Sequence, residues 1–474
     1  MIEDVVVIGG SVAGLATGVA LADKGVSVQV IERDVAPECT SGDDAFLQWK
    51  RPGVPQFHHA HGFSARSRNL LLERMPEVVS ALTADGVEEV NFFKVFAPPE
   101  LWTDADDAYT SLWCRRPGFE LALRRYAAAR IDIRSPAAAA GLVVTPGNPP
   151  CVQGVRLHDG STVEADLVID AGGRRSPVPK WLREAGVNLT LDEQDCDAIY
   201  FTRYYRRNPR GLSPLVLFGA GGITERFGFN AFTGDHDTYA LGMICRPDDR
   251  ALLSLRHDDV FEHVARRIPA LAPWTEPDNG TPLHSVETMA GNHNRRWHYL
   301  VEGRPSVLGI VPVGDALCIT NPFYGWGASM ALTFAFAAAD STIEHGDDLR
   351  DLLASYESKV GNEADEVYNE SAADDRRRIY QWRHQEVPDW DREQMERRDL
   401  VACVAAGALK DPVLGRAFLR RLGLLDPPGS VLDDPEVVEH ARNTQRILAA
   451  KAARRIAPDS DELDSILSAA SPKG

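Results

Sequence analysis

The N-terminal segment constrains the fold of this 474-residue chain more than any other. An apolar run, Asp4 to Ile8, enters a turn, and an alanine- and leucine-rich segment follows as far as Lys24. This order predicts a strand, a tight turn and a helix, the opening unit of a dinucleotide-binding α/β fold. Small residues supply the turn, the close approach of backbone to a pyrophosphate and the packing of helix on strand: Gly9, Gly10, Ser11 and Gly14.

A second predicted strand, Val26 to Ile31, ends at Glu32, where a carboxylate can accept hydrogen bonds from ribose hydroxyl groups. Ser11 replaces the middle glycine usual in this motif, but its side chain is small enough to keep the site open. A βα turn without a ligand remains an alternative for this motif alone. The residues predicted to hold the adenosine and pyrophosphate are Gly9, Gly10, Ser11, Val12, Ala13, Gly14, Glu32 and Arg33.

A second motif near residue 314 is more specific. A predicted strand, Val307 to Val313, leads into Gly314-Asp315, and a predicted helix covers Ala328 to Ala339. A carboxylate at a strand end can bind a polyol such as ribityl, and glycines that open a helix present backbone N–H groups to an anion. For a flavin, that anion is the N1 and C2 carbonyl edge of the reduced ring. The motif therefore predicts FAD, bound here by Asp315, Pro322, Gly325, Trp326, Gly327 and Ala328.

A third predicted strand, Asp166 to Ala171, runs into Gly172-Gly173-Arg174-Arg175-Ser176. With these three motifs in this order, roughly residues 1 to 345 resemble the aromatic-hydroxylase-like (group A) FAD monooxygenases. Within that superfamily the sequence motifs are most similar to those of the flavin epoxidases of polyether antibiotic biosynthesis, the monensin and lasalocid type. The shared segments are Arg51 to Gln56 with His59 and His61, Asn294-Arg295-Arg296, and Asn321 to Gly325.

The resemblance implies a monooxygenase that transfers one oxygen atom from O2, through a flavin C4a-hydroperoxide, to a hydrophobic natural-product intermediate by epoxidation or hydroxylation. It also implies that Arg116, in the helix after Trp113, contacts FAD. Aromatic hydroxylases usually carry Asp-Gly where this chain has Gly172-Gly173, with Asp170 upstream. That motif is associated with nicotinamide contacts, so two electron sources remain open, NAD(P)H and a partner flavin reductase.

Composition limits the partners. A formal net charge of −18 and a pI near 5.2 argue against nucleic acid and anionic membranes, which require a basic face. We expect no membrane insertion, because no run of about 18 apolar residues occurs. A strand at the N-terminus without a charged leader predicts no signal peptide, and seven scattered cysteines without a Cys-x-x-Cys pair are typical of a reduced, cytoplasmic protein. Either a monomer or a homodimer is compatible with the sequence.

The three motifs must share one sheet, which predicts an α/β protein whose Rossmann-type, glutathione-reductase-like FAD domain is discontinuous: residues 1–75, 100–182 and 298–345. Residues 76–99 and 183–297 are then a substrate domain with an antiparallel sheet, and 346–474 a helical C-terminal region. Predicted strands of the substrate domain are Ala198–Arg203, Pro214–Phe218, Phe227–Phe232 and Thr238–Ile244. Predicted C-terminal helices cover 346–384, 392–423 and 434–456, and this region is a candidate cap over the substrate or a dimer contact.

Catalytic residues are not evident, because a flavin monooxygenase needs no side-chain acid or base. Three candidates stand out. His59 and His61 are candidates for a role near flavin or substrate, with structural packing as the alternative; no metal site is predicted, because carboxylate or cysteine partners at fixed spacing are missing. The family places a mobile loop beside the flavin at Arg51, whose guanidinium could stabilise an anionic ring or bind a nicotinamide phosphate, although a solvated loop arginine is nearly as plausible.

Aromatic residues surround the glycine turn. Phe323, Tyr324 and Trp326 are candidates to line an apolar substrate pocket, with packing of the turn as the alternative. Polyether epoxidases carry a smaller polar residue at the position that corresponds to Trp326. We therefore expect the Trp326 indole to narrow the cavity over the flavin.

Three classes of function therefore remain. The FAD monooxygenase is favoured, and an FAD-dependent dehydrogenase or reductase that inserts no oxygen is the main alternative. Halogenation is less favoured because the Trp-x-Trp segment of tryptophan-halogenase-like enzymes is missing. A non-catalytic nucleotide-binding protein ranks last, because the ring-facing motif is intact.

Overall fold

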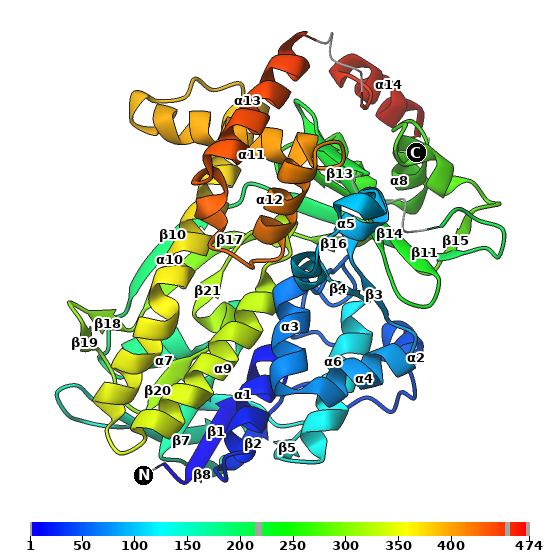
Figure 1. The fold of residues 1–474 in the computed structure, drawn as a ribbon. Coiled ribbons are helices and arrows are strands. Elements are labelled where there is room, and N and C mark those ends of the chain that lie inside the picture. Colours follow the sequence, from blue (N-terminus) through cyan, green and yellow to red (C-terminus); the bar gives the residue numbers. More distant parts are fainter. Residues whose placement is uncertain (1, 214–219, 451–455, 471–474) are drawn as a thin grey trace.

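The computed structural model describes residues 2–213, 220–450 and 456–470. It combines helices and strands in a mixed α/β structure, as expected (Figure 1). The predicted strand Pro214–Phe218 lies outside the described residues. The helices are α1 Val12–Ala22, α2 Gly42–Gln48, α3 Ala65–Arg74, α4 Pro76–Ala84, α5 Phe92–Phe96, α6 Arg116–Ala128, α7 Val178–Glu184, α8 Asp258–Ala265, α9 Gly327–His345, α10 Leu349–Trp382, α11 Arg392–Gly407, α12 Pro412–Leu422, α13 Pro435–Ala450 and α14 Ser460–Ala470.

A five-stranded parallel sheet has the order β20-β9-β1-β2-β5. Its strands come from distant parts of the chain: β1 Asp4–Ile8, β2 Ser27–Ile31, β5 Asp132–Arg134, β9 Leu167–Asp170 and β20 Ile310–Pro312. The sheet is therefore discontinuous in sequence, as the three motifs required. Strands β1 and β2 match the predicted bounds to within one residue, whereas β20 is shorter than the predicted 307–313.

The carboxyl ends of β1, β9 and β20 meet at one edge of this sheet. The Ala171 N–H donates to the Ile8 carbonyl at 2.9 Å, and the Val313 N–H donates to the Asp170 carbonyl at 2.8 Å. The three motifs that follow these strands are thereby side by side, at the edge where ligands of open α/β sheets bind.

Helices cover one face of the parallel sheet. The apolar sides of α1, α9, α10, α3, α4 and α6 share one buried core with the strands. Residues 76–84 were assigned to the substrate domain from sequence, but Val78, Val79 and Leu82 of α4 pack in this core. On the other face a separate core joins the sheet to α7 and to a small antiparallel sheet, β6 Ala139–Thr145, β7 Cys151–Leu157 and β8 Thr162–Glu164.

A mainly antiparallel sheet stands above the edge that carries the motifs (Figure 1). Its strands are β12 Gly221–Ile223, β13 Phe227–Thr233, β14 Thr238–Cys245, β11 Ile199–Arg207, β15 Gly280–Pro282 and β16 Glu287–Met289. A further sheet joins β10 Thr190–Asp195, β17 His293–His298 and β21 Cys318–Ile319, and two short pairs are β3 Glu88–Val90 with β4 Ser111–Trp113 and β18 Leu300–Val301 with β19 Arg304–Pro305.

The C-terminal region is helical, with two differences from the prediction. The single helix predicted over 392–423 is divided into α11 and α12, because Asp411 caps a new helix that begins at Pro412. The last helix, α14, was not predicted; Leu463 and Leu467 pack in the core of the antiparallel sheet beside α8. None of the described helices is long and apolar enough to cross a membrane.

Candidate functional site

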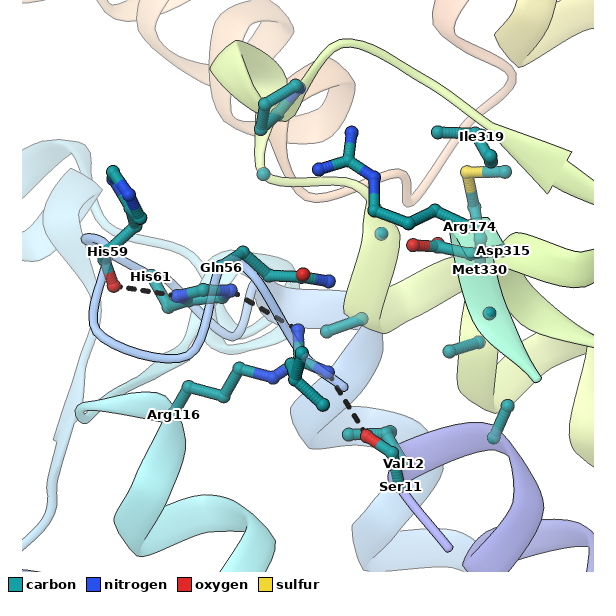
Figure 2. Close-up of a pocket in the computed structure, with 18 of the residues that line it drawn as sticks. Ser11, Val12, Gln56, His59, His61, Arg116, Arg174, Asp315, Ile319 and Met330 are labelled. Carbon is teal, nitrogen blue, oxygen red and sulfur yellow. Dashed lines mark hydrogen bonds between the residues drawn. The ribbon is translucent and has the colours of Figure 1, made fainter. Parts of the chain in front are cut away.

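A cavity of about 610 Å³ lies between the N-terminal ends of α1 and α9. Figure 2 shows Ser11 and Arg116 on one side of it and Asp315 with Arg174 on another. Most residues predicted to hold FAD line this cavity: Gly9, Gly10, Ser11, Val12, Ala13, Glu32, Arg33, Arg116, Asp315, Pro322, Gly325, Gly327 and Ala328. Two predicted residues, Gly14 and Trp326, do not line it.

The first turn of α1 is left open toward the cavity. Ser11 is the N-cap residue, but its hydroxyl donates to Glu120 Oε1 at 2.8 Å and makes no capping hydrogen bond to α1. The Arg116 Nη2 group donates to the same hydroxyl at 3.2 Å, which brings a guanidinium beside the turn. Free N–H groups at a helix end and an adjacent cation are the elements of a phosphate site.

Two glycines in this turn have no room for a side chain. Gly9 has a φ of +105°, and a Cβ there would lie 2.4 Å from the Ala171 carbonyl oxygen. A Cβ on Gly14 would lie 2.0 Å from the Gly9 carbonyl oxygen. Gly14 therefore shapes the turn from behind and needs no contact with a ligand.

Arg51 is buried beside the turn, and its Nη1 donates to the Gly10 carbonyl at 3.4 Å, so it is not a solvated loop arginine; its role near the flavin ring stays a prediction. Its side chain is 2% exposed and donates to Glu32 Oε2 at 2.7 Å, to Asp34 Oδ2 at 3.2 Å and to Glu120. Burial alone lowers its pKa, but the three carboxylates outweigh burial and raise it. Arg51 is thus a cation held in place by three carboxylates beside the turn between β1 and α1.

Glu32 is held in place by Arg51 and by two backbone N–H groups. Its Oε2 also accepts from the Gly10 N–H at 2.7 Å, and its Oε1 accepts from the Asp34 N–H at 2.7 Å. A carboxylate has further lone pairs for ribose hydroxyl groups. Glu120 was missed by sequence reasoning; its spacing of four from Arg116 in a predicted helix was the available signal.

Asp315 follows β20 in the turn Gly314–Ala316, at the far side of the cavity. Its carboxylate has no hydrogen-bond partner among the described residues. Burial raises the pKa of Asp315, while Arg174 and Arg116 lower it in part. A carboxylate without donors that faces a cavity fits a ligand that supplies hydroxyl groups, such as a ribityl chain.

The ring-facing turn ends at a second open helix. Residues Pro322–Tyr324 form a 3-10 turn, Gly325 has a φ of +68°, and α9 begins at Gly327. No side chain caps the N-terminus of α9. Its first N–H groups are therefore available to an anionic edge of a ligand that lies beside Asp315.

Two of the three aromatic candidates line the cavity and the third does not. Phe323 and Tyr324 line the cavity. Trp326 is 1% exposed and packs in the main core, stacked on Tyr324 at 4.9 Å between ring centroids, with the Arg421 guanidinium 5.2 Å from its ring. The prediction that the indole narrows the cavity is wrong, because the backbone at Gly325 turns this side chain inward.

His59 and His61 line the cavity as neutral rings (Figure 2). His61 Nδ1 donates to the His59 carbonyl at 2.8 Å, which leaves Nε2 as the acceptor facing Arg116 Nη1 at 3.4 Å. Burial and Arg116 lower the pKa of His61 to about 4. Burial and the neighbouring histidines lower that of His59 to about 3. Among the described residues no group of histidine, cysteine or acidic side chains is arranged to hold a metal ion.

Asp170 takes part in the Gly172-Gly173 loop from two residues upstream. Its buried carboxylate accepts from the Gly172 N–H at 3.0 Å and from the Ser176 hydroxyl at 2.8 Å. Arg174, which lines the cavity, donates to Asn292 Oδ1 at 2.7 Å. The loop thus has its aspartate in its base and an arginine at its surface.

Burial raises the pKa of Asp170 from its ordinary 3.8 to about 6. A raised folded-state pKa means that the folded protein binds a proton more tightly than the unfolded chain, so stability falls as pH rises through this range. The Asp170→Asn variant is expected to gain stability relative to the natural protein between about pH 4 and pH 6. Urea unfolding at several pH values measures the difference, and a difference that does not change with pH contradicts the assignment.

Beyond the ring-facing turn the cavity is uncharged and largely aromatic and aliphatic, with polar groups from Ser111, Thr202 and Asn230. Its walls come from β11, β13, β14, β4, α5 and α12, and include Phe92, Trp113, Tyr200, Phe232, Met243 and Leu419. None of the described lining residues on these six elements has a charged side chain. The charged lining residues lie at the end that α1, β2 and the Asp170 and Asp315 loops form.

The C-terminal helix α12 closes this apolar end. Leu419, Leu422 and Gly423 line the cavity. Arg416 of the same helix donates to Asp106 Oδ1 at 2.9 Å, which fastens α12 to the segment that precedes β4. The expectation that the C-terminal region covers the substrate is thus consistent with its position.

No known family model matches the sequence. The protein Rv3254 of Mycobacterium tuberculosis is 26% identical over 468 residues, which covers 90% of each chain. A variant of 2-methyl-3-hydroxypyridine-5-carboxylic acid oxygenase is 16% identical with a TM-score of 0.55, over 81% of this chain and 93% of that one. The flavin-dependent brominase Bmp2 is 17% identical with a TM-score of 0.57, over 94% of this chain and 98% of that one. The chain therefore has the fold of these enzymes, a fold that serves more than one reaction.

Proposed function

We propose that the protein is an FAD-dependent monooxygenase that inserts one oxygen atom from O2 into a hydrophobic natural-product intermediate, by epoxidation or hydroxylation. The observation that carries the proposal is a single cavity that joins two open helix N-termini and the unpaired carboxylate of Asp315 to an uncharged aromatic compartment. One end suits a dinucleotide, and the other suits an apolar ligand held against it.

FAD fits the residues present. The first turn of α1 with Arg116 would hold the pyrophosphate, Glu32 the adenosine ribose, Asp315 the ribityl chain and the first turn of α9 the N1 and C2 carbonyl edge of the ring. When bound, FAD would supply the redox and oxygen-activating chemistry.

The chain's own residues bind, orient and exclude water. The N-terminus of α9 stabilises negative charge at the ring edge. Neutral His61 accepts a hydrogen bond from Arg116 and so keeps that guanidinium turned toward Ser11 and the pyrophosphate turn. Leu419 and Leu422 close the apolar compartment, which protects a reactive site from water.

The lining also limits the substrate. A carboxylate or ammonium in the uncharged compartment would lose its hydration without gaining a partner charge, which is costly. The substrate is therefore an uncharged aromatic or polyunsaturated molecule in the part that enters this compartment. The sequence motifs that resemble polyether epoxidases are compatible with such a molecule. The protein would then act in antibiotic or other secondary metabolism. It would do so in the cytoplasm, as a monomer or homodimer.

The electron source is NAD(P)H or a partner flavin reductase. Because Asp170 is used within its own loop, the usual Asp-Gly contact to a nicotinamide is altered. The second candidate function is an FAD-dependent dehydrogenase or reductase that acts on this scaffold without oxygen insertion, because the sequence Asp170-Ala171-Gly172-Gly173 resembles that of some reductases.

The proposal is tested by measuring oxygen consumption and the incorporation of oxygen atoms into the product. Purified protein is loaded with FAD, reduced anaerobically, and mixed with oxygenated buffer that contains matched uncharged and carboxylated polyenes or aromatics. Oxygen consumption coupled to product, and one ¹⁸O atom per product from labelled O2, are expected with the uncharged members only. A product formed without ¹⁸O would establish the dehydrogenase or reductase instead. Adding NADH, NADPH or a flavin reductase with free flavin in place of chemical reduction distinguishes the electron sources.

A further inference from the structure

Asn321 stands directly before the ring-facing turn and uses all of its polar groups in fixing that turn. Its Oδ1 accepts from the Phe323 N–H at 2.9 Å and from the Tyr200 hydroxyl. Its backbone N–H donates to Asn294 Oδ1 at 2.8 Å and to the Ser371 hydroxyl at 3.0 Å. The direction of the Pro322–Tyr324 turn is therefore set by the orientation of one amide side chain.

That amide is oriented by a residue of the C-terminal region. Asn321 Nδ2 donates to Oδ1 of Asp375 at 2.6 Å, and Asn294 Nδ2 donates to Oδ2 of the same carboxylate at 2.8 Å. Asp375 lies in α10, is 1% exposed and is paired with Arg378 at 2.9 Å. The carboxylate does not line the cavity. It can act on a ligand only through the residues that it contacts, and of these Asn321 is hydrogen-bonded within the ring-facing turn.

We propose that Asp375 is a positioning residue for the flavin ring. Through the Asp375–Asn321 hydrogen bond, α10 fixes the orientation of the ring-facing turn and of the N-terminus of α9 that follows it. This inference rests on the proposed use of FAD.

The chemistry of the pair supports it. A carboxylate accepts only, so it forces both asparagine amides to present their NH2 groups to it and their oxygens away from it. The Asn321 oxygen must then face the Phe323 N–H, which fixes the turn. If the carboxylate became an amide, one of the two asparagines would lose its acceptor, and a buried amide without a partner turns to find another.

Asn321 also connects the ring-facing turn to the wall of the uncharged compartment. Tyr200 of β11 lines the cavity and donates to Asn321. A ligand that shifts Tyr200 therefore acts on the same amide that α10 holds. The ring-facing turn is thus held from both the antiparallel sheet and the C-terminal region.

The test compares two buried aspartates. Asp375→Asn removes one acceptor from the Asn294–Asn321 pair. Asp391→Asn is the matched control, because Asp391 is also 1% exposed and accepts from Arg376 and Tyr380 but does not contact the ring-facing turn. Both variants are expected to be less stable in thermal unfolding. Only Asp375→Asn is expected to weaken FAD binding to the apoprotein, by at least about fivefold for one lost hydrogen bond, and to shift the absorbance and midpoint potential of bound flavin.

A milder variant guards against misfolding. Ser371→Ala removes one acceptor of the Asn321 N–H and is expected to change the flavin spectrum in the same direction by less. Equal FAD affinity, spectrum and potential in Asp375→Asn, Ser371→Ala and Asp391→Asn would overturn the inference. Failure of the natural protein to bind FAD would overturn the proposed function instead, so the two failures are distinguishable.

Discussion

Replacement of Gly14 by alanine is expected to weaken the binding of FAD strongly. The new Cβ would lie 2.0 Å from the Gly9 carbonyl oxygen and 3.0 Å from the Ala171 side chain, so the turn between β1 and α1 must open. Opening moves the N–H groups of the first helical turn away from the pyrophosphate that they would hold. Overpacking of this kind also costs about 1–3 kcal/mol of stability.

Fluorescence titration of the apoprotein with FAD measures the effect, and we expect the dissociation constant to rise by at least roughly a hundredfold, about 2.7 kcal/mol. Gly62→Ala is the control, because Gly62 also lines the cavity and a Cβ there meets no atom within 4 Å. Unchanged affinity in Gly14→Ala would show that the turn is not the pyrophosphate site.

Replacement of Asp315 by alanine is expected to separate ligand binding from stability. The carboxylate is partly buried and has no hydrogen-bond donor among the described residues, so its removal leaves the free energy of unfolding of the apoprotein unchanged or higher. FAD loses the acceptor for its ribityl hydroxyl groups, and hydrogen bonds to charged groups contribute about 1.5–3 kcal/mol, or roughly ten- to a hundredfold in affinity.

The pH dependence gives an independent check. Because the pKa of Asp315 is raised in the folded protein, this group stabilises the apoprotein at low pH, and the contribution is lost as pH rises through the raised value. In Asp315→Ala that part of the pH dependence is expected to disappear. A variant such as Glu184→Ala, at an exposed residue paired only with Lys180, serves as the control. If Asp315→Ala destabilises the apoprotein and leaves the affinity for FAD unchanged, the carboxylate has a structural role.

Local signals explain how much of this structure the sequence could predict. The strands β1 and β2 were predictable because apolar runs and flanking glycines act within a few residues, and the same holds for the open ends of α1 and α9. The division of 392–423 was missed because apolar residues at helical spacing continue through Asp411-Pro412. Helix α14 was missed because its amphipathic face is stabilised by a partner, α8, almost 200 residues away in the sequence.

The site shows the same division. Residues inside a motif, such as Ser11 and Asp315, could be placed at the cavity because the motif itself defines the turn that carries them. Arg51 and Asp375 act through partners that lie far away in sequence, 69 residues in the case of Arg51 with Glu120 and 54 for Asp375 with Asn321. Sequence spacing therefore could not show that Arg51 pairs with Glu120 beside α1, or that the C-terminal region reaches the ring-facing turn.

The uncharged compartment under α12 also bears on how a turnover ends. Under the proposed function, an epoxide or a hydroxyl group would make the product more polar than the substrate, and transfer of a polar group from water to a part of the lining that offers no partner is unfavourable. Because most of the lining is apolar, a product whose new oxygen lies away from Ser111, Thr202 and Asn230 would be held less tightly than the substrate. Product would leave before a second oxygen atom is added, so the same wall that selects an apolar substrate also limits the reaction to a single oxidation and reduces inhibition by product.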